Sequence, residues 1–219
     1  MTIKDRRCLV LNDRYMPLSL MPVYTIPIEE AIFRQVKGNC TVVSTYPDAI
    51  GTQNDRVLKW PSIIANHNSH SFKKDLRLRK ESLFYRDHCR CSYCGRELTI
   101  KEITFDHVIP ESRGGKTTWD NVVASCKKCN NKKSDSMSSE WKPKNAPWEP
   151  TFWQMLEIRK KYPLVIDHED WMNFLPMWPA GMYCRTTGVM IMPNRERVQS
   201  SVKPSSEYFR GDHDVVDTD

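Results

Sequence analysis

Two closely spaced pairs of cysteines constrain this chain of 219 residues more than any other feature. Cys91 and Cys94 form one CxxC pair, and Cys126 and Cys129 form the second. Two residues between thiolates let a tight turn aim both sulfurs at one ion, and four thiolates suit tetrahedral Zn²⁺. We therefore predict one structural zinc ion per chain, which closes a loop of roughly thirty residues between the two pairs.

Disulfide bonds are the main alternative for these cysteines. The N-terminal stretch MTIKDRRCLVL has too short an apolar region for a secretion signal, so we expect a reducing, cytoplasmic environment. A thioredoxin-like redox site would use one CxxC pair within a βαβ pattern, which does not fit. Cys89 lies two residues before Cys91 and is the one ambiguous cysteine. We expect Cys8, Cys40 and Cys184 to be small buried hydrophobic residues.

The residues between the two cysteine pairs predict a strand, a loop, a second strand and a helix. Residues 103–109 are rich in β-forming side chains, and Gly114 and Gly115 follow in a polar segment. A second apolar run, residues 122–124, leads to the second cysteine pair and to a basic helix over residues 127–133.

This order of elements resembles the HNH endonuclease family of bacteria and phages. The match rests on Asp106-His107 followed by Pro110, on Asn121 before the second strand, and on a helix after the last cysteine. It extends weakly to LVLNDRYMPLSL near the start, which is similar to the opening of a set of HNH proteins. The resemblance implies an α+β fold with a ββα-metal nuclease core that is stapled by the four-cysteine zinc site.

The resemblance also assigns roles that suit phosphodiester hydrolysis. A water molecule must lose a proton as it attacks phosphorus, and the imidazole of His107 can accept that proton. Asp106 and Asn130 are candidate ligands for Mg²⁺ or Mn²⁺, which prefer oxygen donors and stabilise the leaving oxygen. Asn121 would orient the His107 ring or brace the loop. Asp106, His107, Asn121 and Asn130 are therefore the candidate catalytic residues.

Two features of this motif need explanation: the residue after the last cysteine, and the directions of Asp106 and His107 on their strand. Many HNH proteins have histidine directly after the last cysteine, whereas this chain has Asn130, and Asn131 is a neighbouring alternative. An amide oxygen is still a hard donor, which keeps Mg²⁺ or Mn²⁺ as the expected ion. Adjacent residues of a strand also point to opposite faces. Either the strand ends near Asp106, or Asp106 binds the ion while His107 reaches the scissile phosphate from the side.

Charge supports a nucleic-acid substrate. The chain has 33 Lys and Arg against 27 Asp and Glu, a net charge of +6, and its basic residues cluster around the two cysteine pairs. Basic side chains in such positions hold phosphates without selecting a sequence. For residues 73–90 the alternative is a solvated charged face. The candidate nucleic-acid contacts are Arg113, Lys116, Lys128, Lys132 and Lys133.

We therefore expect a metal-dependent HNH endonuclease that hydrolyses DNA and nicks one strand per active site. The expected partners are DNA and either a second copy of the chain or a larger nucleic-acid-processing complex, with no membrane, in the cytoplasm of a bacterial or phage-infected cell. One alternative is a zinc ribbon that binds nucleic acid without cutting it. Another is a nuclease that acts on RNA or on branched DNA.

The rest of the chain predicts four segments. Residues 1–70 form an α+β lead, with a helix over 27–36 flanked by strands, and residues 71–140 form the nuclease core. Residues 141–202 are expected to be a helical extension that begins with a linker and contains a helix over 151–162 that Pro163 ends. Residues 203–219 are polar and acidic, which favours disorder.

Overall fold

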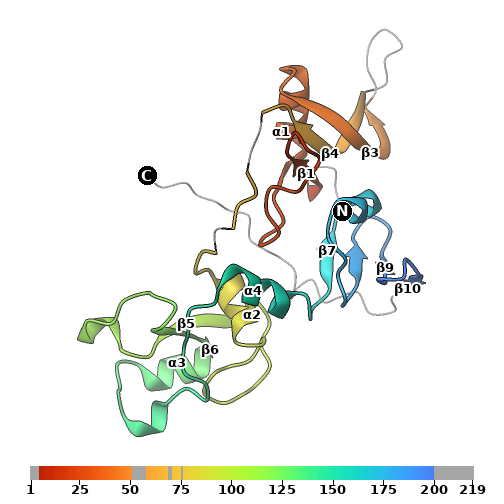
Figure 1. The fold of residues 1–219 in the computed structure, drawn as a ribbon. Helices are drawn as coiled ribbons and strands as arrows, with labels where there is room; N and C mark the ends of the chain where they lie inside the picture. The colour runs from red at the N-terminus through yellow and green to blue at the C-terminus, as the bar shows by residue number, and fades with distance from the viewer. Residues whose placement is uncertain (1–4, 51–57, 69–70, 75, 200–219) are drawn as a thin grey trace. The chain divides into compact units, whose positions relative to one another are not determined.

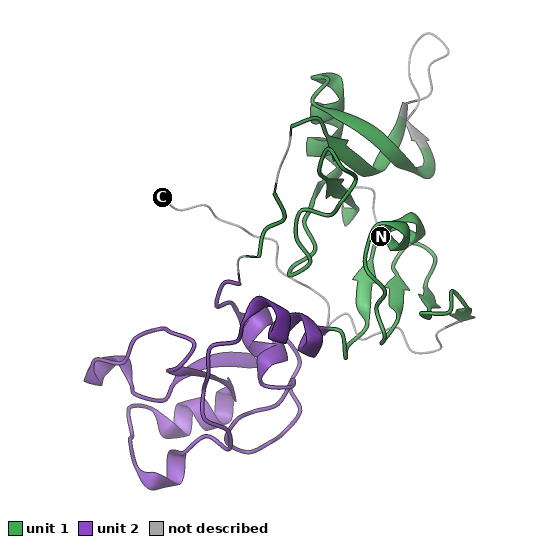
Figure 2. Ribbon diagram, viewed as in Figure 1, with its two compact units in different colours: residues 1–74, 160–201 green, residues 75–159, 202–219 purple. Residues whose placement is uncertain are grey.

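The computed structural model describes residues 5–50, 58–68, 71–74 and 76–199 and divides the chain into two compact units (Figures 1 and 2). Among the described residues, the first unit contains those up to 74 and those over 160–199, and the second contains 76–159. The second unit is therefore an insertion in the sequence of the first. The disordered tail predicted for residues 203–219 lies outside the described residues.

A four-stranded sheet with the order β2-β1-β4-β3 forms the first part of unit 1. It contains β1 (Arg7–Leu11), β2 (Thr25–Pro27), β3 (Cys40–Ile50) and β4 (Leu58–Asn66), and α1 (Ile28–Val36) contacts it. β1 pairs with β4 in parallel, and the other neighbours are antiparallel. These elements confirm the predicted α+β lead. The buried cluster under this sheet consists of Cys8, Val10, Leu18, Ile26, Ala31, Cys40 and Ile64.

The second part of unit 1 corrects the helical extension expected for residues 141–202. After Pro163 the described chain has one short 3-10 helix, η4 (Glu169–Asn173), and a sheet with the order β10-β9-β8-β7. Each strand has only three residues, too few for a period to stand out in the sequence. The strands are β7 (Leu164–Ile166), β8 (Met182–Cys184), β9 (Val189–Ile191) and β10 (Arg197–Gln199).

Unit 2 has the predicted order of strand, loop, strand and helix (Figure 1). β5 (Ile103–His107) pairs antiparallel with β6 (Val122–Cys126), and the loop between them contains the 3-10 turn η2 (Glu111–Arg113). α3 (Lys127–Lys133) starts directly at the end of β6 and contacts both strands. The strand-loop-strand hairpin and α3 together form the ββα core.

A buried arginine joins this core to the segments on either side of it. Arg86 ends α2 (Lys80–Arg86) and is 2% exposed. Its guanidinium donates hydrogen bonds to the carbonyl oxygens of Trp119 and Val122, both at 2.7 Å, and of Trp148 at 3.1 Å. It also pairs with the Asp87 carboxylate at 2.8 Å. One side chain therefore ties together a helix before the core, the core itself and a segment after it.

The first and last helices of unit 2 pack against each other. α4 (Phe152–Arg159) confirms the helix predicted over 151–162, and it contacts α2. The guanidinium carbon of Arg159 lies 4.5 Å from the centroid of the Tyr85 ring. Burial raises the pKa of Glu81, and the nearby charge of Arg159 opposes this rise. The two ends of the inserted unit therefore lie close together.

None of the helices in the described part of the chain has the length and apolar character that crossing a bilayer requires.

Candidate active site

The four predicted cysteines converge on one point in unit 2. The Sγ atoms of Cys91, Cys94, Cys126 and Cys129 all lie within 4.8 Å of one another. The first pair lies on a turn in which Gly95 has a φ of +78° and donates its N–H to the carbonyl of Cys91 at 2.8 Å. The second pair spans the end of β6 and the first turn of α3. Four thiols at this separation fit a tetrahedral metal ion of the zinc type.

Backbone groups prepare two of these sulfurs for a metal. Cys91 Sγ accepts a hydrogen bond from the N–H of Cys126, and Cys126 Sγ accepts one from the N–H of Cys129, both at 3.4 Å. Burial raises the pKa of Cys91, but backbone N–H groups of Cys126, Cys94 and Tyr93 outweigh it and lower the pKa to about 6. The thiolate is the form that binds metal. Cys89 is buried and lies outside this cluster.

Asp106 lies on β5 with its side chain directed at α3. Its carboxylate is 2% exposed and lies 3.2 Å from Nζ of Lys133. The hydroxyl of Tyr93 donates a second hydrogen bond to the same carboxylate. Burial, followed by the Asp106 hydrogen bond and charge, raises the pKa of Tyr93, so the phenol keeps its proton and remains a donor. Tyr93 lies between Cys91 and Cys94 in the sequence. The segment that carries the first cysteine pair therefore also contacts the Asp106 carboxylate.

His107 follows Asp106 on the same strand but lies against the loop. The strand does not end before this point, because Asp106 pairs with Val123 and His107 pairs with Val122. Nε2 of His107 lies 2.8 Å from Oγ1 of Thr117 and 3.3 Å from Oε1 of Glu111. The imidazole is about one-fifth exposed, at 18%. β5 therefore ends at His107, directly after Asp106, and both residues are still paired with β6.

Asn121 braces the loop that carries the His107 contacts. Its side chain accepts a hydrogen bond from the N–H of Ile109 at 2.9 Å, and it donates to the carbonyls of Ile109 at 3.1 Å and Lys116 at 2.9 Å. A Cβ atom on Gly115 would lie 1.7 Å from the carbonyl oxygen of Ile109, so only glycine fits there. Two roles were considered for Asn121, orienting the His107 ring and bracing the loop. The contacts that its side chain makes are those of a loop brace.

Asn130, not Asn131, faces β5. Nδ2 of Asn130 donates to Oγ1 of Thr104 at 3.0 Å and to the carbonyl of Phe105 at 2.9 Å, whereas Asn131 is exposed. Because its amide nitrogen is occupied by β5, the amide oxygen is the atom that remains for a metal. A carboxylate and an amide oxygen form a hard donor set, which suits Mg²⁺ or Mn²⁺.

The basic residues divide into two groups. Arg113, Lys116, Lys128 and Lys132 are exposed and available to a polyanion. The expectation that Lys133 contacts nucleic acid is wrong, because its side chain is 1% exposed and its Nζ donates to the carbonyl of His107 at 2.6 Å. Lys133 lies three positions after Asn130 on α3, so both side chains extend from one face of the helix toward β5.

Sequence reasoning missed four residues that contact the motif. Tyr93 and Lys133 hold the Asp106 carboxylate, while Glu111 and Thr117 contact the His107 ring. The spacing of Lys133 from Asn130 was one available signal, since side chains three positions apart share a helix face. The other three contacts depend on how loops fold back, which no local pattern indicates.

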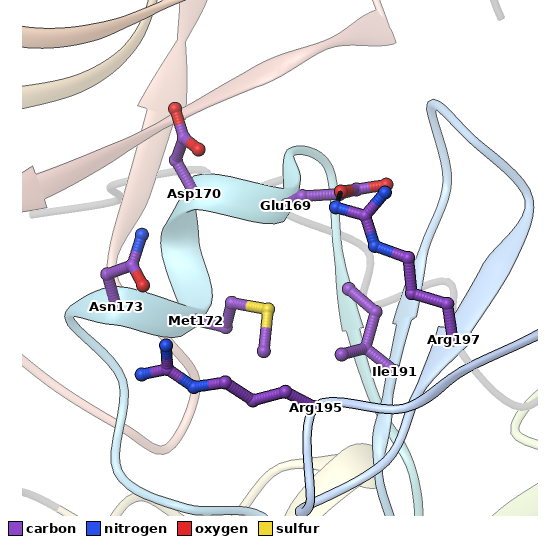
Figure 3. Close-up of a pocket in the computed structure, with 7 residues that line it drawn as sticks. All are labelled: Glu169, Asp170, Met172, Asn173, Ile191, Arg195 and Arg197. Atoms are coloured by element: carbon purple, nitrogen blue, oxygen red, sulfur yellow. Dashed lines mark hydrogen bonds and ion pairs between the residues drawn. The ribbon is translucent and has the colours of Figure 1, made fainter.

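A separate pocket of about 200 Å³ lies in unit 1 (Figure 3). η4 forms one side of it, and β9 with the segment that leads to β10 forms the other. Glu169 and Arg197 pair at 2.5 Å across its rim, which neutralises the charge there. Among the described residues, the only group of metal-ligating Cys, His or acidic side chains is the four-cysteine cluster of unit 2. The candidate chemistry is therefore in unit 2.

Known proteins match this chain over the same unit. Residues 91–144 match the family model described as HNH endonuclease. The CRISPR-associated endonuclease Cas9 of Corynebacterium diphtheriae is 37% identical over 57 residues, which is 26% of this chain and 5% of that protein. The chain therefore spans a small fraction of this relative. The match confirms the predicted resemblance, and residues 91–144 form a domain of the HNH endonuclease type.

Proposed function

We propose that this protein is a divalent-metal-dependent endonuclease that hydrolyses phosphodiester bonds of DNA and cuts one strand at each active site. The observation that carries this proposal is that Asp106 and His107 are adjacent at the end of β5 and that Asn130 is hydrogen-bonded to the same strand, in a ββα unit with four clustered cysteines. Each of the three residues has the chemistry that one part of the hydrolysis requires.

His107 is the proposed general base. Its Nε2 is engaged by Thr117 and Glu111, while Nδ1 has no hydrogen-bond partner among the described residues. Nδ1 is therefore the nitrogen that can take a proton from the attacking water. Family resemblance implies products with a 5′-phosphate and a 3′-hydroxyl.

Asp106 and Asn130 are the proposed ligands of a catalytic Mg²⁺ or Mn²⁺. Such an ion, when bound, would stabilise the negative charge that develops on the phosphate and the leaving oxygen. Asp106 is held by Tyr93 and Lys133, and Asn130 is held by Thr104 and the carbonyl of Phe105. Both side chains are thus oriented by fixed contacts to β5 and its neighbours.

The four cysteines would hold one structural zinc ion. Apparent binding energies for such sites are on the order of 10–16 kcal/mol, which is comparable to the whole stability of a small domain. With the ion bound, Cys91 and Cys94 would hold Tyr93 between them, and Cys126 and Cys129 would hold the start of α3. Both elements contact residues of the proposed active site, so zinc would support catalysis without taking part in it.

Exposed basic residues near the motif support DNA as the substrate. Arg113 and Lys116 lie in the loop between β5 and β6, and Lys128 and Lys132 lie on α3. These side chains can neutralise phosphates on either side of the scissile bond without selecting a sequence. One active site per chain makes nicking the natural activity of a monomer, and a homodimer would cut both strands.

We also propose that the protein acts in the cytoplasm.

The decisive experiment is a nicking assay on supercoiled plasmid with zinc-loaded protein. We expect relaxed circles when Mg²⁺ or Mn²⁺ is added and none without it, and mild EDTA should stop cutting before zinc is lost. The His107→Ala variant separates this activity from a contaminant. A protein that binds the plasmid but yields no relaxed product under any metal condition would be the non-catalytic zinc ribbon. Parallel assays on RNA and on branched DNA separate the two remaining alternatives.

A further inference from the structure

Lys133 is buried against the carboxylate that we propose as a metal ligand. Its side chain is 1% exposed, and that of Asp106 is 2% exposed. Nζ lies 3.2 Å from Oδ2 and 3.4 Å from Oδ1 of Asp106, and it donates to the carbonyl of His107 at 2.6 Å. Lysine is almost never fully buried unless its charge is paired. The Lys133 ammonium neutralises the Asp106 carboxylate and also holds the backbone carbonyl of His107.

Stability alone is a poor explanation for this buried pair. Removing two charges from water costs free energy that their attraction often does not recover, and apolar replacements of such pairs are frequently neutral or stabilising. Lys127, Lys128 and Lys132 of the same helix are all exposed. Lys133 alone among the lysines of α3 is directed at β5, toward the two adjacent residues of the motif.

We propose that Lys133 is a resident cation of the active site that holds Asp106 ready when no divalent ion is bound. This inference rests on the proposed function, because it takes Asp106 as a metal ligand. Any divalent ion that binds this carboxylate must share it with an ammonium that already neutralises it. Lys133 is thus a positioning residue, and it sets how much divalent ion the enzyme needs.

If the Lys133 ammonium and a divalent ion share the Asp106 carboxylate, two consequences follow. Cations a few ångströms apart repel each other by several times the thermal energy, even with the screening found near a protein surface. The catalytic ion should therefore bind weakly and exchange readily. The carboxylate also keeps its position without the ion, because Lys133 and the Tyr93 hydroxyl both hold it.

The test compares Mn²⁺ binding in two variants of the full, zinc-loaded chain. Lys133→Met removes the buried charge and keeps the length of the side chain, and Lys132→Met removes the neighbouring exposed charge. Free Mn²⁺ is measured by electron paramagnetic resonance at pH 8. We expect Lys133→Met to bind Mn²⁺ at least about tenfold more tightly than wild type. Lys132→Met should stay within about twofold. Equal or weaker binding in Lys133→Met would overturn the proposal.

A second measurement uses the wild-type chain and decides the matter even if Lys133→Met does not fold. Buried, hydrogen-bonded ammonium groups of ¹⁵N-labelled lysine can be followed by nuclear magnetic resonance, and the Lys133→Arg variant identifies the signal by its loss. We expect the Lys133 ammonium signal to shift as Mg²⁺ is added and to saturate with the ion. A signal that stays unchanged at saturating Mg²⁺ overturns the proposal.

The Asp106→Ala variant separates failure of this inference from failure of the proposed function. Mn²⁺ binding that depends on Asp106 but not on Lys133 overturns the resident cation alone. Mn²⁺ binding that survives Asp106→Ala overturns the ligand assignment, and the proposed metal site with it. Loss of binding in Asp106→Ala together with tighter binding in Lys133→Met supports both.

Discussion

The side-chain amide of Asn121 pairs with both the N–H and the carbonyl of Ile109, like a short piece of backbone. Ile109 lies two residues after His107, so this pair fixes the exit of β5 at the proposed base. The backbone continues the contact, because the N–H of Val108 donates to the carbonyl of Asn121 at 2.8 Å. Asn121 therefore acts on the position of His107 through the chain that follows it.

Replacing Asn121 with alanine should destabilise the fold and impair cutting together. Each buried group that loses its partner costs about 1–3 kcal/mol, so we expect the free energy of unfolding to fall by more than about 2 kcal/mol. Urea unfolding followed by circular dichroism measures this, with Asn145→Ala as the control because Asn145 is exposed. Equal unfolding curves for the two variants would contradict the brace.

Gly114 and Gly115 should respond differently to alanine. A Cβ on Gly114 meets open space, so its cost comes only from a φ of +83° and should be about 1–2 kcal/mol. A Cβ on Gly115 would collide with the Ile109 carbonyl and must displace the loop. We expect Gly115→Ala to unfold at a lower urea concentration and to cut more slowly. The reverse order would mean that the loop has another conformation.

Comparing Asn130→Ala with Asn131→Ala identifies which of the two asparagines is the last residue of the motif. Asn130→Ala should lose most of its nicking activity, because it removes a proposed metal ligand next to β5. Asn131→Ala should cut at close to the wild-type rate, since Asn131 is exposed. Initial rates on supercoiled plasmid at saturating Mg²⁺ decide between them. An inactive Asn131→Ala with an active Asn130→Ala would shift the assignment by one residue.

Zinc content should distinguish the clustered cysteines from their neighbour. Cys126→Ser should lose the metal and should aggregate or partly unfold, because the ion would supply much of the stability of this unit. Cys89→Ala should keep one zinc per chain, since Cys89 lies outside the cluster. Elemental analysis of protein purified without added metal measures both. A folded, active Cys126→Ser without zinc is the result that would refute a structural site.

His107→Ala should fold, keep its zinc and bind DNA, but should cut about 10²–10⁴-fold more slowly. We attribute this loss to the missing proton acceptor, and circular dichroism of the variant checks that the fold is kept without the Thr117 and Glu111 contacts. His67→Ala is the matched control, as it removes an exposed imidazole from unit 1. Single-turnover nicking rates provide the comparison. Wild-type rates in His107→Ala would exclude this residue as the base.

Local patterns in the sequence predicted the ββα core because its signals are short-range. The CxxC spacing, the β-rich run that ends at His107 and the basic helix that follows Cys126 each depend on neighbours within a few residues. The partners of the motif were not predicted. Tyr93 reaches Asp106 from 13 positions away, and whether Lys133 is buried or exposed depends on how α3 rotates against β5.

Longer-range organisation was also beyond local patterns. Residues 141–202 were expected to form a helical extension, whereas residues 164–199 contain four three-residue strands that belong to the same compact unit as the N-terminal part of the chain. A strand of three residues has little period of its own, and its stability comes from neighbours in the sheet. The division into units was therefore visible only once contacts distant in sequence were known.

The packing of α2 on α4 makes the nuclease unit resemble a cassette with adjoining ends. Glu81 lies in the first helix of this unit and Arg159 is the last residue of its last helix, and the charge of Arg159 acts on the Glu81 carboxyl. A host whose sequence is interrupted by such a cassette has only a short gap to close, since entry and exit are neighbours. Gain or loss of the whole nuclease during evolution would thus leave the surrounding unit with little more than a change of loop.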